Sequence, residues 1–313
     1  MTPLISNILI AVLSLILIMF SASYIIAAVS DYAKKLGISN YLIGFLVVSI
    51  GTSIPELSTA IVASMKGAGA LVLGDVLGAN IIDVTIVLGI TAIIGKKLFI
   101  HGKILNKTVL SVLFVSVVPL ALGLDGKLSR FDGIILIAAF FLYMFDLLKK
   151  EGQMGKIKKD VKWDTIWKDM VIITISLITL LISANMLVNS AMFFGTMFGV
   201  SPLLLGLVVI AIGTTIPELT VEIQSVLKGV SGIAFGDILG SVVCNSSLVL
   251  GLAALISPIY ISKLSFGIFR DSAMFMITSV FIALLFIRKK QITWIEGVGL
   301  LMLYATFLVT VFL

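Results

Sequence analysis

The chain has 313 residues, of which 60% are hydrophobic and only 12% are charged, and its formal net charge is +6. Soluble domains average roughly 45–50% apolar and 25% charged residues, so this composition excludes a soluble protein and indicates a lipid bilayer as the solvent. A single cysteine and a single histidine exclude a disulfide framework, a multi-thiolate metal site and His-rich zinc chemistry. We therefore expect no prosthetic group.

Ten segments of the chain are long and apolar enough to be predicted as membrane spans, because a helix needs about 20 mainly apolar residues to cross a bilayer. The first of them is too long for the apolar core of a cleavable signal peptide. The predicted fold class is an all-α integral membrane protein with ten transmembrane helices. The ten segments are residues 8–29, 41–64, 71–94, 106–123, 131–148, 169–194, 202–226, 233–256, 269–287 and 293–312.

The distribution of Lys and Arg predicts how these spans are inserted. If the N-terminus lies outside, 17 of the 22 Lys and Arg residues fall in cytoplasmic connections, including all seven lysines from Lys149 to Lys168. We therefore expect a multi-pass protein of the cell membrane with both termini extracellular. The positive charge then reflects topology, and neither a nucleic acid nor an obligatory protein partner is expected beside the lipid.

The sequence contains an internal repeat. Residues 44–95, the first repeat segment, align without a gap with residues 206–257, the second repeat segment, and 21 of the 52 positions are identical. We expect a first five-helix repeat at 1–148, a Lys-rich cytoplasmic linker at 149–168 and a second five-helix repeat at 169–313. Because five is odd, the two repeats are inverted relative to each other, as in many secondary transporters with a midplane binding site.

Each repeat segment carries a glutamate deep in a predicted span. Glu56 and Glu218 occupy equivalent positions, each directly after a proline, Pro55 and Pro217. An ionisable side chain at mid-membrane costs at least about 2.5–3.5 kcal/mol, so its default interpretation is functional. A proline also removes a helical N–H and disturbs the carbonyl four residues before it, which predicts free carbonyls near each glutamate.

The surrounding residues supply further oxygen atoms. Each motif adds two hydroxyls to its carboxylate, and the next span adds the equivalent pair Asp83 and Asn245. Such hard oxygen ligands suit Ca²⁺ or Na⁺ and are wrong for copper or zinc. Asp75 and Asp237 are predicted to be helix N-caps near the starts of their spans. Glu222, whose equivalent is Ala60, is expected either to line a cytoplasmic vestibule or to carry protons.

The paired motifs G-T-[ST]-I-P-E, each followed by G-D-x-L-G-x-x-x-x-[DN], resemble the alpha repeats of the calcium/cation antiporter superfamily, and the proline before glutamate is most similar to its sodium/calcium exchanger branch. This resemblance implies ten helices in inverted repeats, cation sites between helices 2, 3, 7 and 8, and helices 1 and 6 sliding as a gate. It implies that Glu56 and Glu218 bind Ca²⁺, and that the carbonyls of Ser49 and Ala211 contribute to Na⁺ sites. The implied cation-binding residues are Thr52, Ser53, Glu56, Asp83, Thr214, Thr215, Glu218, Ser241 and Asn245.

The chain departs from the family pattern at two places. Prokaryotic members often have Asn in the first repeat and Asp in the second, whereas here Asp83 comes first and Asn245 second. Ala79 stands where the family often has serine, while its equivalent, Ser241, keeps the hydroxyl.

The expected function is antiport of Ca²⁺ for Na⁺ by alternating access, with both ions as transported substrates. A Ca²⁺/H⁺ antiporter that uses the same site, or one that uses K⁺, remains an alternative. A cation channel, from another class, is less compatible with an occluded carboxylate site. An enzyme is not expected, because Asp75 and Asp237 lack the Gly-x-Gly-Asp context of intramembrane aspartyl proteases.

Overall fold

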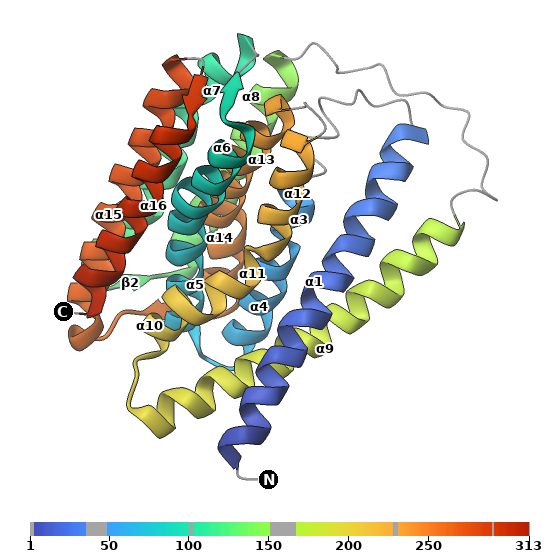
Figure 1. Ribbon diagram of the computed structural model, residues 1–313. Coiled ribbons are helices and arrows are strands. Elements are labelled where there is room, and N and C mark those ends of the chain that lie inside the picture. Colours follow the sequence, from blue (N-terminus) through green and yellow to red (C-terminus); the bar gives the residue numbers. More distant parts are fainter. Residues whose placement is uncertain are drawn as a thin grey trace.

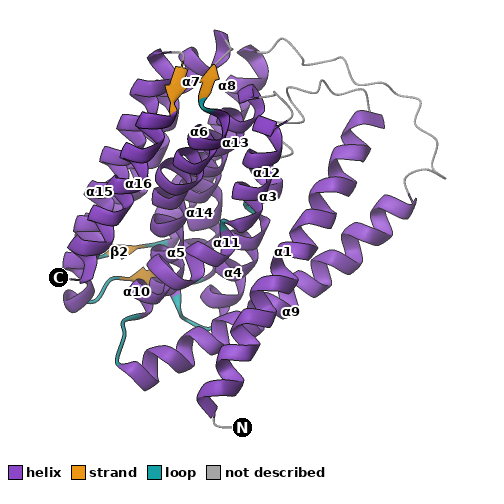
Figure 2. Ribbon diagram, in the orientation of Figure 1, coloured by secondary structure: helices purple, strands orange, loops and turns teal. Residues whose placement is uncertain are grey.

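The structure, a computed structural model, describes residues 3–35, 49–99, 103–150, 167–227, 231–289 and 291–312. These residues are almost entirely helical, apart from short strands at the ends of the helices (Figure 2). The predicted linker at 149–168 lies almost wholly outside the described residues, as do residues 41–48 of the second predicted span.

The first repeat segment forms two interrupted helices, one made of α3 and α4 and one made of α5, η2 and α6. The elements before residue 151 are α1 (Pro3–Lys35), α3 (Ser49–Thr52), α4 (Ile54–Met65), α5 (Gly69–Ile82), η2 (Asp83–Val87), α6 (Leu88–Gly95), β1 (Lys97–Phe99), α7 (Lys103–Leu122), η3 (Gly123–Asp125), β2 (Lys127–Leu128) and α8 (Arg130–Lys150).

The second repeat segment forms a similar series of elements. The elements after residue 166 are α9 (Trp167–Phe198), α10 (Pro202–Leu205), η5 (Gly206–Ile210), α11 (Ala211–Thr214), α12 (Ile216–Leu227), α13 (Ser231–Val243), η6 (Cys244–Val249), α14 (Leu250–Ile256), β3 (Ile259–Tyr260), α15 (Lys263–Lys289), β4 (Gln291–Thr293) and α16 (Trp294–Phe312).

Within the described residues, seven helical stretches are long and apolar enough to cross a membrane. The chain is therefore an all-helical membrane protein. The other three predicted spans contain α3 with α4, α7 and α8. The seven stretches are Pro3–Ser21, Gly69–Gly95, Met170–Phe198, Pro202–Leu227, Phe235–Ile256, Lys263–Phe286 and Trp294–Val311.

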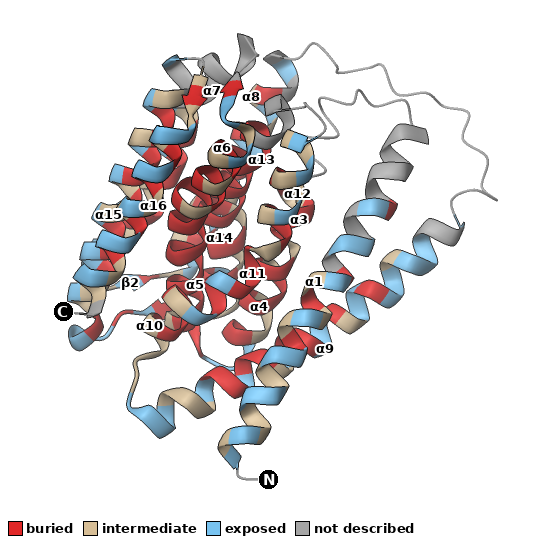
Figure 3. Cartoon of the chain, viewed as in Figure 1, coloured by how far each residue is buried: buried red, intermediate tan, exposed pale blue. Residues whose placement is uncertain are grey.

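Two continuous helices form the centre of the molecule. In an 18-residue apolar part of Gly69–Gly95, which contains α5, η2 and α6, 78% of the residues are buried, and the share is 83% in Phe235–Ile256, which contains most of α13 with η6 and α14. In contrast, the share is 17% in Pro3–Ser21 of α1 and 28% in Met170–Phe198 of α9. Figure 3 shows the same contrast, with buried residues gathered in the central helices and exposed residues more frequent on the outer ones. Figure 1 shows α1 and α9 side by side at one edge, and these two helices pack extensively on each other.

The helix α5 approaches α10 and η5 closely because both sides carry glycine at the contact. A Cβ atom on Gly74 would lie 2.0 Å from the carbonyl oxygen of Leu203, and one on Gly206 would lie 2.1 Å from that of Leu71. Gly74 and Gly206 belong to different repeat segments, so α5 packs directly on the backbone of α10 and η5. Small residues are the usual means of close helix packing in membranes, where burial from lipid supplies little driving force.

Two short antiparallel strand pairs join loops that are distant in the sequence. β1 pairs with β4, where Leu98 lies opposite Ile292, and β2 pairs with β3, where Leu128 lies opposite Ile259. Each pair therefore connects a loop before residue 151 with a loop after residue 256.

Candidate functional site

Both glutamate motifs lie just after a break in a helix. The backbone leaves the helical conformation at Ser53 (φ −78°, ψ 4°) and at the equivalent Thr215 (φ −85°, ψ 3°). A proline follows two residues later in each case, and proline cannot donate to the helical ladder and crowds the preceding turn. The duplicated sequence thus produces the same local break twice, and each break begins a new helix, α4 or α12.

Glu56 and Glu218 lie in the first turns of these new helices, in the interior of the protein. Their side chains are 0% and 1% exposed, and none of the four carboxylate oxygens has a hydrogen-bond partner among the residues that the structure describes. Glu218 is close enough to Glu56 to interact with it electrostatically. The partial positive charge of a helix N-terminus favours an anion at this position. It does not offset the cost of two buried carboxylates, which is several kcal/mol for each unpaired ion.

The threonines of the two motifs bind aspartates of the opposite repeat segment. The Thr52 hydroxyl donates to Asp237 Oδ1 at 3.1 Å, and the equivalent Thr214 hydroxyl donates to Asp75 Oδ1 at 3.2 Å. These two contacts are reciprocal: each residue of one pair is equivalent to a residue of the other pair. They therefore fix the two repeat segments against each other beside the glutamates.

The helix N-cap interpretation of these aspartates is wrong. α5 begins at Gly69 and α13 at Ser231, so Asp75 and Asp237 each lie well inside a helix. Both are buried, at 2% and 0% exposure. The sequence signal that could have identified them is their duplication within the G-D-x-L-G motif. The N-cap interpretation assumes helices that start closer to the aspartates than α5 and α13 do.

The symmetry of the threonine–aspartate contacts is broken at two places. Thr52 also lies 3.2 Å from Ser241 Oγ, whereas the equivalent position beside Thr214 is Ala79, which has no hydroxyl. Asp75 also accepts a hydrogen bond from Thr59 at 3.1 Å, whereas the equivalent of Thr59 is Val221. In agreement, Asp237 Oδ2 has no hydrogen-bond partner among the described residues.

Asp83 and Asn245 lie at or next to the starts of the π-helical segments η2 and η6. Both side chains are 0% exposed, and their polar atoms have no hydrogen-bond partner in the described part of the chain. Short π-helical segments inside α-helices are frequent at functional sites. Two residues later, Thr85 and Ser247 donate to the backbone carbonyls of Ile81 and Val243. No sequence feature indicated these segments.

The remaining candidate oxygens are divided between free and engaged atoms. The Ser53 hydroxyl is buried without a hydrogen-bond partner among the described residues, whereas that of Thr215 donates to the Ala211 carbonyl at 2.8 Å. The Ser49 carbonyl accepts a hydrogen bond from the Thr52 hydroxyl at 3.3 Å. Both carbonyls also accept a backbone N–H, from Ser53 at 3.3 Å and from Thr215 at 3.1 Å, so each already has two hydrogen-bonding neighbours.

The interior contains many acidic side chains and no opposing basic ones. Among the described residues whose burial is known, every buried charged side chain is acidic. No three His, Cys, Asp or Glu side chains of the described residues converge closely enough to hold a metal ion by themselves. The negative charge of the interior is therefore spread over α4, α5, η2, α12 and α13 rather than concentrated in one acidic cage. The six buried acidic residues are Glu56, Asp75, Asp83, Glu218, Glu222 and Asp237.

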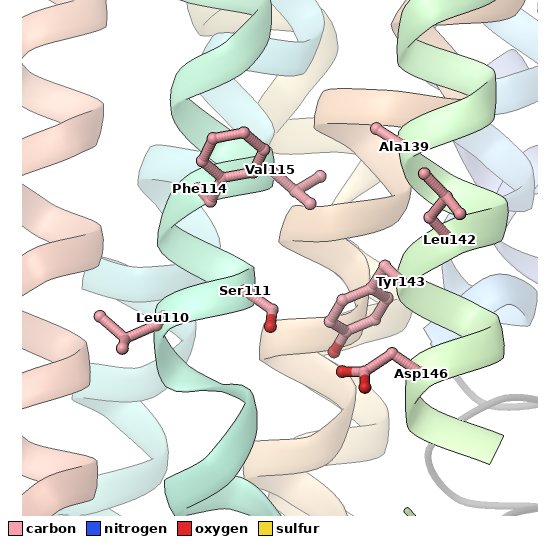
Figure 4. Close-up of a pocket in the computed structure, with 8 residues that line it drawn as sticks. All are labelled: Leu110, Ser111, Phe114, Val115, Ala139, Leu142, Tyr143 and Asp146. Atoms are coloured by element: carbon pink, nitrogen blue, oxygen red, sulfur yellow. The ribbon is translucent and has the colours of Figure 1, made fainter. Parts of the chain in front are cut away.

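Two other features lie apart from these motifs. Cys244 is a buried free thiol, and His101 is outside the described residues. A pocket lies between α7 and α8 (Figure 4), and most of its lining side chains are apolar, including Leu110, Phe114 and Leu142. It contains none of the candidate cation-binding residues.

Comparison with known proteins places the chain in a family. Residues 6–148 and 168–313 match the family model described as "Sodium/calcium exchanger protein". The chain is 34% identical to the inner membrane protein YrbG of Escherichia coli (strain K12) over 306 residues, which cover 93% of this chain and 91% of that protein. It is 27% identical over 347 residues to the sodium/calcium exchanger MaX1 of Methanosarcina acetivorans, with 98% of each chain covered.

The fold is also similar to that of solved structures. The structure of the sodium-calcium exchanger NCX_Mj soaked with 2.5 mM Na⁺ and 10 mM Sr²⁺ superposes with a TM-score of 0.71 at 25% identity, covering 98% of this chain and 99% of that one. The structure soaked with 2.5 mM Na⁺ and 1 mM Sr²⁺ gives a TM-score of 0.70 and covers 99% of both chains. The chain therefore belongs to the sodium/calcium exchanger protein family, and it is a multi-pass membrane transporter and not an enzyme.

Proposed function

We propose that this protein exchanges Ca²⁺ for Na⁺ across the cell membrane by alternating access to an interior carboxylate site. The observation that carries this proposal is the pair Glu56 and Glu218, both buried, both without a hydrogen-bond partner among the described residues, and close enough to repel each other. Two unpaired buried carboxylates are strongly destabilising unless a cation binds between them. A divalent ion matches their combined charge.

The other ligands come from the same motifs. Ca²⁺ takes six to eight oxygen ligands, so two carboxylates must be supplemented by carbonyls, hydroxyls or water. We assign this role, and the coordination of Na⁺, to the residues around the two helix breaks and the two π-helical segments. The complete set is Thr52, Ser53, Glu56, Asp83, Thr214, Thr215, Glu218, Ser241 and Asn245.

We propose a ten-helix architecture of two inverted five-helix repeats, 1–148 and 169–313, joined by a cytoplasmic linker at 149–168. The equivalent breaks at Ser53 and Thr215 and the reciprocal threonine–aspartate contacts support two copies of one unit that meet at the site. The α1 and α9 helices pack on each other and are much less buried than the central helices. This packing suits a pair that slides across a fixed core and opens the site to one side at a time.

We place both termini outside the cell. The strand pairs support this topology, because each joins two loops that the positive residues assign to the same side. β1 and β4 both belong to connections assigned to the cytoplasm, and β2 and β3 both belong to connections assigned to the outside.

The proposal is tested by ⁴⁵Ca²⁺ uptake into proteoliposomes under imposed gradients of Na⁺, K⁺ or pH. We expect an outward Na⁺ gradient to drive uptake, and a K⁺ or pH gradient alone to leave it at background. Full uptake driven by pH alone, without sodium, would establish the Ca²⁺/H⁺ alternative instead. Ion currents far above carrier turnover would establish a channel.

A further inference from the structure

The second repeat segment carries an acidic residue that the two-glutamate site does not use. Glu222 lies one turn beyond Glu218 in α12, is 0% exposed, and neither of its carboxylate oxygens has a hydrogen-bond partner among the described residues. Its equivalent, Ala60, is also buried, at 1% exposure. The carboxylate is therefore an addition to one side of a site that is otherwise built by repetition.

The acidic residue on the neighbouring helix lacks a hydrogen-bond donor that its equivalent in the first repeat segment has. Glu222 lies in α12, which packs on α13, the helix that carries Asp237. The two carboxylates interact electrostatically, and Glu222 also interacts with Asp83. Asp237 Oδ1 accepts from Thr52, but Oδ2 has no partner in the described part of the chain. In the first repeat segment, Asp75 Oδ2 is bound by Thr59, whose equivalent here is Val221.

The two repeat segments differ at two adjacent positions here. The first repeat segment has Thr59 and Ala60, and the second has Val221 and Glu222 at the equivalent positions. The first exchange leaves one carboxylate oxygen of Asp237 without a donor, and the second supplies another carboxylate nearby. Unpaired carboxylates buried on two packed helices are stabilised either by protons or by a cation that binds them both.

We propose that Glu222 and Asp237 form a further binding site for a monovalent cation of the Na⁺ class, separate from the Glu56–Glu218 site. The available protein ligands are few, namely two oxygens of Glu222 and Oδ2 of Asp237, whereas Ca²⁺ requires six to eight oxygens. Asp83, which also interacts electrostatically with Glu222, adds negative potential. Among the described residues whose burial is known, none of the buried ones is Lys or Arg. Asp75, with both oxygens occupied by Thr59 and Thr214, forms no counterpart.

The test is equilibrium binding of ²²Na⁺ to the purified full-length protein in Ca²⁺-free buffer. We expect Glu222→Gln to bind one Na⁺ fewer per chain than the wild type, and Glu222→Ala, which installs the residue of the first repeat segment, to do the same. Val221→Thr adds a hydroxyl that we expect to donate to Asp237 as Thr59 does to Asp75. It should weaken the binding of this one Na⁺ severalfold, and it gives a test even if the Glu222 variants fold poorly. The matched control is Glu296→Gln, which neutralises a carboxylate that is bound by Lys289 and Thr293 at the start of α16.

Binding of ⁴⁵Ca²⁺ to the same samples separates this proposal from the proposed function. Glu222→Gln should keep its Ca²⁺ binding, whereas Glu56→Gln should lose Ca²⁺ and keep the Na⁺ held by Glu222. An unchanged Na⁺ stoichiometry and affinity in Glu222→Gln and Val221→Thr would overturn the site, including the case in which only proton release changes.

Discussion

The hydroxyl of Thr52 donates to Asp237 across the interface between the two repeat segments, and among the described residues it is the one hydrogen-bond donor to that carboxylate. The equivalent Asp75 accepts hydrogen bonds from both Thr214 and Thr59. The two halves of the interface therefore differ in how many hydrogen bonds secure a buried carboxylate. The difference follows from a single exchange, Thr59 for Val221, and it has a measurable consequence for stability.

Thr52→Val should destabilise the protein more than Thr214→Val. Both substitutions preserve shape and remove a hydroxyl, but the first leaves both oxygens of Asp237 unpaired, while the second leaves Asp75 with Thr59. Leaving a buried acceptor without its donor costs about 1–3 kcal/mol. Thermal unfolding of the purified variants in detergent measures the difference. Equal losses from the two substitutions would contradict the asymmetry.

Adding a hydroxyl at Ala79 should raise the apparent affinity for Na⁺ while barely changing that for Ca²⁺. Ser241 lies 3.2 Å from Thr52, whereas the buried Ala79 offers Thr214 no such oxygen. One ligand of hydrogen-bond strength contributes about 0.5–1.5 kcal/mol. Ala79→Ser should therefore raise the affinity for Na⁺ by up to roughly tenfold, and Ser241→Ala should lower it by a similar factor. The measurement is the Na⁺ concentration that half-activates Ca²⁺ flux. A silent Ala79→Ser together with a silent Ser241→Ala would remove these positions from the Na⁺ sites.

The close contact between α5 and η5 should not tolerate a methyl group. A Cβ on Gly78 would lie 2.2 Å from the backbone oxygen of Leu207, so the two backbones would have to move apart. Overpacking of this kind typically costs about 1–3 kcal/mol or more. Gly78→Ala should therefore lower the melting temperature clearly. Gly299→Ala is the control, because nothing lies within 4 Å of its Cβ position and alanine is favoured over glycine inside a helix.

Cysteines placed at Lys127 and Lys97 should react with impermeant thiol reagents from opposite sides of the membrane, after Cys244 is replaced by alanine. Both lysines are exposed, at the ends of β2 and β1 respectively. The distribution of positive residues assigns Lys127 to the outside and Lys97 to the cytoplasm. Labelling of both from one side in intact cells would refute the proposed topology.

The sequence predicts the repeat and the membrane spans of this fold, but not the contacts between its helices. The repeat and the membrane environment were readable because duplicated motifs and apolar length are properties of the sequence itself. The buried positions of Glu56 and Glu218 followed from the same pattern. The reciprocal contacts of Thr52 and Thr214 were not predictable, because a sequence does not show which helix faces which across an interface.

Other features could not be predicted from the sequence, each for a local reason. Asp75 and Asp237 were mistaken for helix N-caps because aspartate favours that position and helix starts are hard to locate within an apolar run. The π-helical segments at Asp83 and Cys244 have no known sequence signature. The exchange of Thr59 for Val221 was visible in the alignment of the repeat segments. Its meaning became clear only when the structure placed Thr59 against Asp75.

The most direct test of the account is calorimetric titration of Ca²⁺ into the purified protein in sodium-free buffer. We predict that the wild type and Glu296→Gln bind Ca²⁺ and lose it when Na⁺ is added, because the two ions compete for the interior oxygens. Glu56→Gln and Glu218→Gln should each abolish Ca²⁺ binding while keeping a wild-type unfolding transition. Undiminished Ca²⁺ binding by either folded glutamine variant would contradict the claim that these two glutamates form the Ca²⁺ site.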